Sequence, residues 1–282
     1  MARLDRHDPI KVAVTLENYL GTMLPTPSTS HVNSDRIYEP AEDSFLLLDT
    51  ISSPTESAFL ARRFAHNLEV PLVLEVGTGS GVVLAFITAH ALEILGRTDV
   101  LTVGVDINPF ACTATEQTVM QACRETSHAM YLGCLNADLS SCLRHGVADI
   151  VVFNPPYVPT VELPRLLTAE DSNLCAEIDA FEQESRLLSL SYSGGKDGME
   201  VVDRLLDELP LILNEERGVA YILLCQQNKP GSVAQRIEDW GRGWSVEAVG
   251  QSGKTGGWEK LQILRICRIG VDEALGRRPL LH

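Results

Sequence analysis

Apolar runs alternate with polar and glycine-rich stretches along most of this chain. Short β-branched runs predict buried strands at residues 72–76, 101–105, 131–137, 149–153 and 218–225. Apolar periodicity predicts helices at residues 40–48, 82–95, 108–124, 199–213 and 230–240. Residues 244–249 and 259–269 are expected to pair across a Gly-rich loop. The alternation predicts one α/β domain with a mixed sheet and an antiparallel C-terminal strand pair.

The first helix of this domain is expected to begin near Pro40, with residues 45–48 (Phe-Leu-Leu-Leu) as its buried face. Upstream, residues 10–20 have the pattern of a short helix, and residues 22–30 have the composition of a linker. We therefore predict three parts, divided only by sequence pattern. They are a flexible N-terminal extension over residues 1–35, a folded domain over residues 36–269 and a frayed tail over residues 270–282.

The composition of the chain argues against several kinds of binding partner. The 282 residues are 45% hydrophobic and 22% charged, which is typical of a soluble globular protein. With 23 basic and 38 acidic side chains the net charge is −15, which argues against nucleic acid or an anionic membrane as partner, although a local basic patch remains open. No apolar run has the length of a membrane span. Seven cysteines without a C-x-x-C pair indicate reduced thiols in a cytoplasmic or nuclear protein with no metal site of its own.

The most informative stretch is residues 149–157 (Asp-Ile-Val-Val-Phe-Asn-Pro-Pro-Tyr), in which two prolines end a buried strand. We call residues 154–157 the elbow. It follows the carboxyl end of a strand, where ligands bind in open α/β sheets. The side-chain oxygen of Asn154 and the carbonyl of Pro155 can each accept one N–H of a planar NH2 group, and Tyr157 can stack on that group. The elbow alone fits an ordinary strand-ending turn equally well, because Asn-Pro is a common turn opener.

Polar or glycine residues also follow the three preceding strands. Residues 77–81 (Gly-Thr-Gly-Ser-Gly) form a strand–turn–helix junction that lets a ligand approach the backbone, although the spacing differs from that of dinucleotide sites. Asp106 ends the second strand, where a carboxylate can accept ribose hydroxyls. Asp138 and Leu139 follow the third strand and can contact an adenine amino group and ring. Each feature alone fits a tight turn or a helix cap, but their succession favours a nucleoside site.

Five motifs carry a resemblance to a known family. In order they are residues 38–43 (YEPAED), 74–82 (LEVGTGSGV), 106–109 (DINP), 154–158 (NPPYV) and 194–198 (GGKDG). Together they resemble the HemK-type glutamine N5-methyltransferases, specifically the eukaryotic branch that modifies the class-1 translation release factor. The match covers residues 36–269, and the joint pattern is far more specific than any single motif.

The resemblance implies a Rossmann-like, seven-stranded class I S-adenosylmethionine-dependent methyltransferase domain. It implies methylation of the glutamine in the Gly-Gly-Gln motif of the release factor, whose side-chain amide the catalytic candidates Asn154, Pro155, Pro156 and Tyr157 would receive. It places the cofactor, S-adenosyl-L-methionine, against Ser44, Glu75, Gly77, Thr78, Gly79, Asp106, Asp138, Leu139 and Asn154. It also implies a heterodimer with a small zinc-binding activator subunit, which would cover the aliphatic strand at residues 100–105 if that strand lies at a sheet edge.

The chain departs from the family pattern at several points. It lacks the N-terminal helical domain of the bacterial relatives, residues 158–190 form a longer segment than expected, and Ser44 stands where threonine is expected. Three other functions stay open: adenine-N6 methylation of a flipped base, protein-lysine methylation, and a non-catalytic scaffold. The acidic charge argues against the first. A lysine must lose a proton and gains little from two acceptors, and the intact motifs argue against a scaffold.

Overall fold

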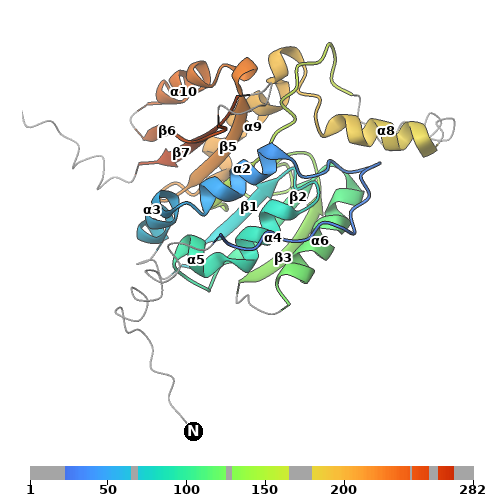
Figure 1. The fold of residues 1–282 in the computed structure, drawn as a ribbon. Helices are drawn as coiled ribbons and strands as arrows, with labels where there is room; N and C mark the ends of the chain where they lie inside the picture. Colours follow the sequence, from blue (N-terminus) through green and yellow to red (C-terminus); the bar gives the residue numbers. More distant parts are fainter. Residues whose placement is uncertain are drawn as a thin grey trace, which may run out of the picture.

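A seven-stranded mixed sheet organises the computed structural model, which describes residues 23–64, 69–124, 129–164, 180–241, 243–253 and 260–269. The strand order is β3-β2-β1-β4-β5-β7-β6 (Figure 1). The strands are β1 (Leu72–Val76), β2 (Leu101–Asp106), β3 (Met130–Asn136), β4 (Ile150–Phe153), β5 (Val219–Cys225), β6 (Trp244–Gln251) and β7 (Leu261–Arg268). The strands from β3 to β5 are parallel, whereas β7 runs antiparallel to both β5 and β6. The predicted fold class, with its antiparallel C-terminal pair, is confirmed.

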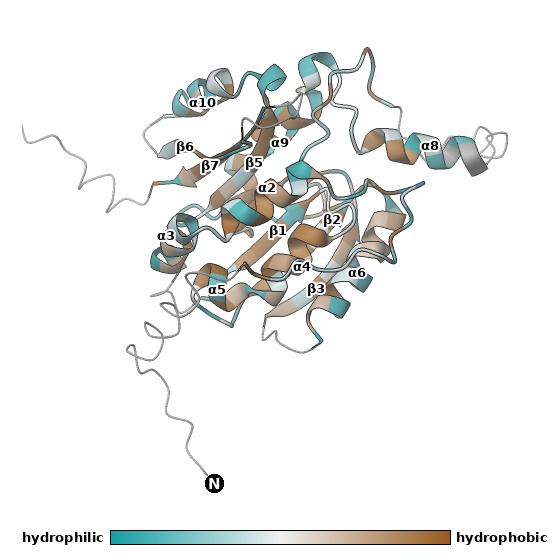
Figure 2. Ribbon diagram, in the orientation of Figure 1, coloured by the Kyte–Doolittle hydropathy of each residue, from teal (hydrophilic) through white to brown (hydrophobic). Residues whose placement is uncertain are grey.

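Helices cover both faces of this sheet. These helices are α2 (Glu42–Ile51), α3 (Pro54–Phe64), α4 (Val82–Ala89), α5 (Ala91–Leu95), α6 (Pro109–Ala122), α9 (Glu200–Ile212) and α10 (Pro230–Glu238). Helix α8 (Ala180–Leu190) projects away from the sheet (Figure 1). Helices α2 to α5 pack on one face, against side chains such as Val73, and α6 packs beside α4. Helices α9 and α10 pack on the other face, against Leu74 and its neighbours. The inner strands are mostly apolar, as Figure 2 shows for β5, and β4 and β5 are apolar along their whole lengths because both of their faces are buried.

The first helix differs from its prediction. Helix α2 begins at Glu42, so Pro40 lies before it. Phe45 is 44% exposed, whereas Leu47 and Leu48 of the predicted face are buried, together with Ser44 and Ile51. This spacing of three and four residues lies on one side of a helix, whereas Phe45 faces the other way. The structure also contains α3, which the sequence pattern did not indicate, and the predicted 82–95 helix divides at His90 into α4 and α5.

The sheet edge was assigned to the wrong strand. The segment at residues 100–105 forms β2, which lies between β3 and β1. The edge strands are β3 and β6, and β3 pairs with β2 alone among the described strands. Its apolar side chains Met130, Leu132 and Leu135 are 61%, 53% and 42% exposed. An apolar edge strand of this kind presents unpaired backbone groups to a partner.

The segment before α2 lies across α4 and α6 (Figure 1). His90 Nε2 lies 3.0 Å from the carbonyl of Pro25, and Asn108 Nδ2 donates to the carbonyl of Arg36 at 2.8 Å. The predicted linker begins one residue before this described segment, which has irregular backbone. The predicted 10–20 helix and 270–282 tail lie outside the described residues, and the three-part division stays a prediction.

No described helix is both long and apolar enough to cross a bilayer.

Candidate active site

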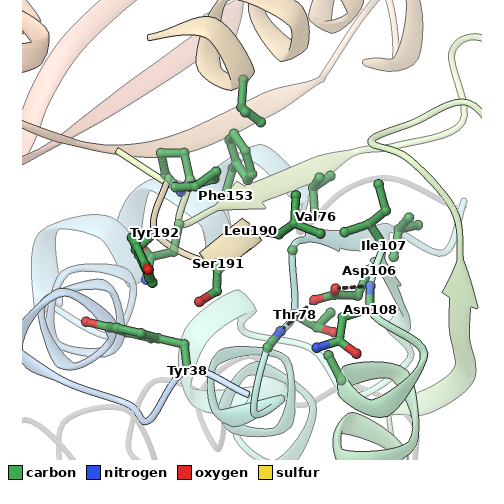
Figure 3. Close-up of a pocket in the computed structure, with 18 of the residues that line it drawn as sticks. Tyr38, Val76, Thr78, Asp106, Ile107, Asn108, Phe153, Leu190, Ser191 and Tyr192 are labelled. Carbon is green, nitrogen blue, oxygen red and sulfur yellow. Dashed lines mark hydrogen bonds between the residues drawn. The ribbon is translucent and has the colours of Figure 1, made fainter. Parts of the chain in front are cut away.

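A cavity of about 320 Å³ lies at the carboxyl ends of β1, β2 and β4 (Figure 3). In this sheet β1 lies between β2 and β4, and the chain connections leave it in opposite directions, which is where ligands bind in open α/β sheets. The predicted site residues all line it: Ser44, Glu75, Gly77, Thr78, Gly79, Asp106, Asp138, Leu139, Asn154, Pro155, Pro156 and Tyr157. The structure therefore brings the predicted catalytic residues and the predicted cofactor-binding residues together in one cavity. The role of each residue stays a prediction.

The glycine turn after β1 serves two physical purposes. Gly79 and Gly81 both have positive φ angles, +53° and +78°, which favour glycine. A Cβ at Gly81 would lie 2.5 Å from Thr115 Cα, so this glycine lets α4 approach α6. A Cβ at Gly79 would meet no described heavy atom within 4 Å. Gly79 therefore leaves open space beside the cavity, whereas Gly81 is required for packing.

Two buried carboxylates hold this turn in place. Glu75 is 2% exposed and accepts the backbone N–H of Leu84 at 2.9 Å, which caps α4. Asp106 is 8% exposed and accepts the N–H groups of Gly79 and Asn108, each at 2.8 Å. Desolvation raises the pKa of both groups, and the charge of Asp106 raises the pKa of Glu75 further. Each carboxylate oxygen retains a second lone pair, so both groups can also accept ligand hydroxyls.

Asp138 and Leu139 extend the cavity beyond β3. Arg204 on α9 donates to Asp138 at 2.6 Å, and both side chains are partly exposed. Leu139 has a φ of +48°, although it is not a glycine, and its side chain is buried. Such a conformation costs of order 1–3 kcal/mol and is concentrated at ligand sites. The strained backbone therefore supports the prediction that Leu139 contacts a ligand.

The elbow presents one free acceptor. Asn154 Nδ2 donates to Asp43 Oδ2 at 3.1 Å, and the hydroxyl of Tyr157 donates to the same oxygen at 3.4 Å. Asn154 Oδ1 is buried and has no hydrogen-bond partner among the described residues. A buried acceptor without a partner costs free energy unless a ligand satisfies it. The elbow therefore has the geometry of a site for an N–H donor.

A distant loop fixes the backbone of the elbow. A Cβ at Gly194 would lie 2.5 Å from the carbonyl oxygen of Pro156, and one at Gly198 only 2.0 Å from that of Tyr157. Asn228 Nδ2 donates to the carbonyls of Tyr157 and Gly198, at 3.1 and 3.2 Å. Gly194 and Gly198 are thus needed because this loop packs directly on the elbow.

Sequence reasoning missed several residues that line the cavity or support it. They are Tyr38, Asp43, Leu187, Leu190, Tyr192, Arg204 and Asn228. Figure 3 shows Tyr38 and Tyr192 at the end of the cavity away from Asp106. The motif at residues 38–43 already contained Tyr38 and Asp43, and Leu187 and Leu190 lie in the 158–190 segment, which is longer than the family pattern predicts. Nothing in the local sequence pointed to Arg204 or Asn228.

The lining fits the cofactor that the motifs imply. Glu75, Asp106 and Asp138 supply acceptors for hydroxyl and amino groups, and their negative charge favours a sulfonium. Ile107, Leu139 and neighbouring apolar side chains supply a surface for a flat ring. Within the described part of the chain, no group of His, Cys, Asp and Glu side chains has an arrangement that could hold a metal ion.

Comparisons with known proteins agree with this arrangement. The chain is 30% identical to the eRF1 methyltransferase catalytic subunit mtq2 of Schizosaccharomyces pombe, over 88% of this chain and 97% of that protein. It is 31% identical to the human methyltransferase HEMK2, over 88% of this chain and 99% of that protein.

Comparison with solved structures shows that the fold is shared and says nothing of function. The catalytic domain of hMettl16, solved with the MAT2A 3′UTR hairpin 1, superposes with a TM-score of 0.50 at 13% identity, over 92% of this chain and 80% of that one. No family model matches the chain. The two relatives align over nearly their whole lengths, and the fold and cavity are those their methyltransferase names require. This chain therefore belongs to the HemK-type eukaryotic release-factor glutamine methyltransferase family, whose members use S-adenosylmethionine.

Proposed function

We propose that this chain transfers a methyl group from S-adenosylmethionine to the side-chain amide nitrogen of the glutamine in the Gly-Gly-Gln motif of the eukaryotic class-1 release factor. The observation that carries the proposal is the buried, unpartnered Oδ1 of Asn154 beside the carbonyl of Pro155. The relative in fission yeast is named an eRF1 methyltransferase, which supports the choice of substrate.

The elbow can supply what this reaction needs. An amide nitrogen attacks poorly because its lone pair is delocalised into the carbonyl group. Asn154 Oδ1 and the Pro155 carbonyl would each accept one N–H, which fixes the amide plane so that the nitrogen lone pair, perpendicular to it, points at the methyl donor. Both hydrogen bonds strengthen as positive charge develops on nitrogen, so they stabilise the transition state more than the bound substrate. When bound, S-adenosylmethionine would supply an electrophilic methyl group and leave as the neutral thioether S-adenosylhomocysteine. The amide N–H becomes acidic as the C–N bond forms, and its proton would pass to water.

The acceptor pair also favours glutamine over lysine. A planar, neutral NH2 group offers two N–H donors in fixed directions, which match two acceptors held on a stiff backbone. A lysine must first lose a proton, and no described group in the elbow is placed to take it. Tyr157, which is buried at the cavity wall, offers a ring against which the planar amide can stack.

We further infer that a small zinc-binding activator subunit covers β3. Leu132 of β3 is exposed, and so is Met120, at 60%, on α6, the helix that contacts β3. Both add apolar surface near the open strand edge. The name of the fission yeast relative, a catalytic subunit, supports a partner. Leu132→Asp should abolish co-purification with a co-expressed activator. Soluble, fully active enzyme without a partner would contradict this inference.

The substrate is tested by methyl transfer from labelled S-adenosylmethionine, with the enzyme co-expressed with the candidate activator. Wild-type release factor is compared with its Gln→Asn motif variant, and histone and single-stranded DNA serve as competing substrates. We expect label on the wild-type factor only, lost in Asn154→Ala and retained in Asn33→Ala, an exposed control outside the cavity. Label on histone or DNA and none on the factor would reject the proposed substrate.

A further inference from the structure

We propose that Asp43 is a positioning residue that fixes the orientation of the Asn154 amide, so that its oxygen and not its nitrogen faces the acceptor substrate. The proposal rests on the proposed function, because it assigns Asp43 a part in receiving the substrate amide. Asp43 lies in the first turn of α2, far from the elbow in the sequence, and none of the motif-based site assignments included it.

Asp43 connects three residues of the cavity wall. It is 3% exposed, and its Oδ1 accepts the backbone N–H of Ser44 at 2.6 Å. Its Oδ2 accepts Asn154 Nδ2 at 3.1 Å and the hydroxyl of Tyr157 at 3.4 Å. Both oxygens are therefore engaged, one within α2 and the other with the elbow. The first turn of a helix also favours a negative charge, because its backbone N–H groups point toward it.

The contact with Asp43 selects one of two amide orientations. The oxygen and nitrogen of an asparagine side chain have nearly the same size, so packing alone does not distinguish them. A carboxylate accepts hydrogen bonds but cannot donate them. If the Asn154 amide were reversed, its Oδ1 would face Asp43 Oδ2 at about the same separation, and two acceptors would repel each other.

The selected orientation decides what the substrate meets. With Nδ2 on Asp43, Asn154 Oδ1 remains as the buried acceptor without a partner. In the reversed orientation, an NH2 group would face the substrate NH2, and two donors cannot satisfy each other. Asp43 therefore acts through Asn154 and without touching the substrate, and through the same oxygen it holds the hydroxyl of Tyr157.

Asp43→Asn tests this with almost no change in shape. The backbone N–H of Ser44 keeps the oxygen of the new amide in place, so its NH2 group faces Asn154. Asn154 should then rotate to present its oxygen to that NH2 and its nitrogen to the substrate. Glu42→Gln is the matched control, because Glu42 precedes Asp43 in the same turn but is exposed and does not line the cavity.

We expect Asp43→Asn to lower kcat for the release factor about 100-fold. Its Kd for S-adenosylmethionine and its thermal midpoint should stay close to the wild-type values, and Glu42→Gln should match wild type throughout. A purely structural role of Asp43 would instead lower the thermal midpoint, with any loss of activity following the loss of folded protein. A wild-type kcat in Asp43→Asn overturns the proposal.

An activity-independent measurement separates this inference from the proposed function. The side-chain ¹⁵N–¹H signals of Asn154, identified by their loss in Asn154→Ala, report the hydrogen bond to Asp43. They should move in Asp43→Asn and stay in place in Glu42→Gln, and unmoved signals overturn the proposal. If the wild-type enzyme does not methylate the release factor, the proposed function fails. The Asn154 signals then still decide whether Asp43 orients the amide.

Discussion

The two ends of the cavity are built in different ways. The cofactor end, formed by residues 77–81 with Glu75 and Asp106, is held by hydrogen bonds between carboxylates and nearby backbone N–H groups. The acceptor end is the elbow, which is held by Asp43, by the loop at residues 194–198 and by Asn228. The first is a local turn between a strand and a helix, and the second is an assembly of distant segments. We therefore expect the two ends to respond differently to substitution.

Gly198→Ala should have the largest effect, because it breaks the acceptor end alone. Its φ is +69°, and the new Cβ would lie 2.0 Å from the carbonyl oxygen of Tyr157. Strain and displacement together should destabilise the fold by about 3 kcal/mol, and a shift of the elbow should lower kcat on the order of 100-fold. Denaturant unfolding and steady-state kinetics measure these effects.

Gly146→Ala is the control for backbone strain. Gly146 has the same φ of +69°, but a Cβ there would meet no described atom within 4 Å. Gly146→Ala should lower the free energy of unfolding by about 1 kcal/mol and leave kcat unchanged. Equal effects of the two substitutions would show that the contact with the elbow is unimportant.

Gly79→Ala tests the cofactor end. The new methyl group would meet no described atom within 4 Å, so the stability cost should match that of Gly146→Ala. Gly79 lines the cavity, however, and the affinity for S-adenosylmethionine should fall about tenfold because the backbone is no longer open to close approach. Calorimetric titration of the cofactor measures the change. Unchanged affinity would show that the turn at Gly79 does not approach the cofactor.

Glu75→Gln should reveal the stability cost of a buried charge. The pKa of Glu75 is raised in the folded protein, mainly by desolvation, so the folded state binds more protons than the unfolded chain above pH 4.5. The contribution of Glu75 to the stability of the wild-type protein therefore falls as the pH rises from the pKa of Glu75 in the unfolded chain to its pKa in the folded protein. Glutamine does not titrate, so the variant should melt about 2–4 °C higher at pH 8, with the gain shrinking toward pH 4.

The same substitution should weaken cofactor binding about tenfold, because hydrogen bonds to charged groups are the stronger ones. Thermal melts across this pH range, with and without S-adenosylmethionine, measure both effects. A difference in melting temperature that does not change with pH would contradict the raised pKa as its cause.

Arg204→Ala should have the smallest effect. The Arg204–Asp138 ion pair is partly exposed, and such pairs contribute about 0–1 kcal/mol. We expect little change in stability and at most a threefold loss of cofactor affinity, which is about 0.7 kcal/mol. Arg236→Ala is the matched control. Arg236, on α10, forms a similarly exposed ion pair with Asp203, which lies on α9 like Arg204, and Arg236 does not line the cavity. A larger loss of affinity in Arg204→Ala would make this pair part of the cofactor end.

The sequence predicted the cofactor end better than the acceptor end for a physical reason. Gly77 and Gly79 lie in the turn after β1, and Asp106 is the last residue of β2, so strand periodicity and turn residues were enough to place them. The sequence also identified Asn154 and Tyr157, but it gave no sign that Asp43 orients Asn154, because that contact joins residues 111 positions apart. Contacts of this kind depend on strand order, which periodicity does not determine.

Errors in the predicted elements have the same origin. Both β2 and β3 carry apolar residues, and their sequences do not show which of them has a neighbour on both sides. Phe45 was expected in the core because it begins an apolar run, yet the register of α2, which starts at Glu42, turns it outward. Neither outcome follows from local propensity, since tertiary packing decides both.

The hydrogen bonds of Asn228 also bear on how the enzyme is made. Asn228 leaves the ribosome 71 residues after Tyr157, the elbow residue whose carbonyl it binds. The nascent chain therefore has the whole cofactor end, and the elbow sequence itself, well before it has the side chain that fixes the elbow. Competence to transfer a methyl group arises late in synthesis, after β5 and the turn that follows it have folded. A chain that ends before this turn contains every residue of the cofactor end but lacks the side chain that holds the elbow.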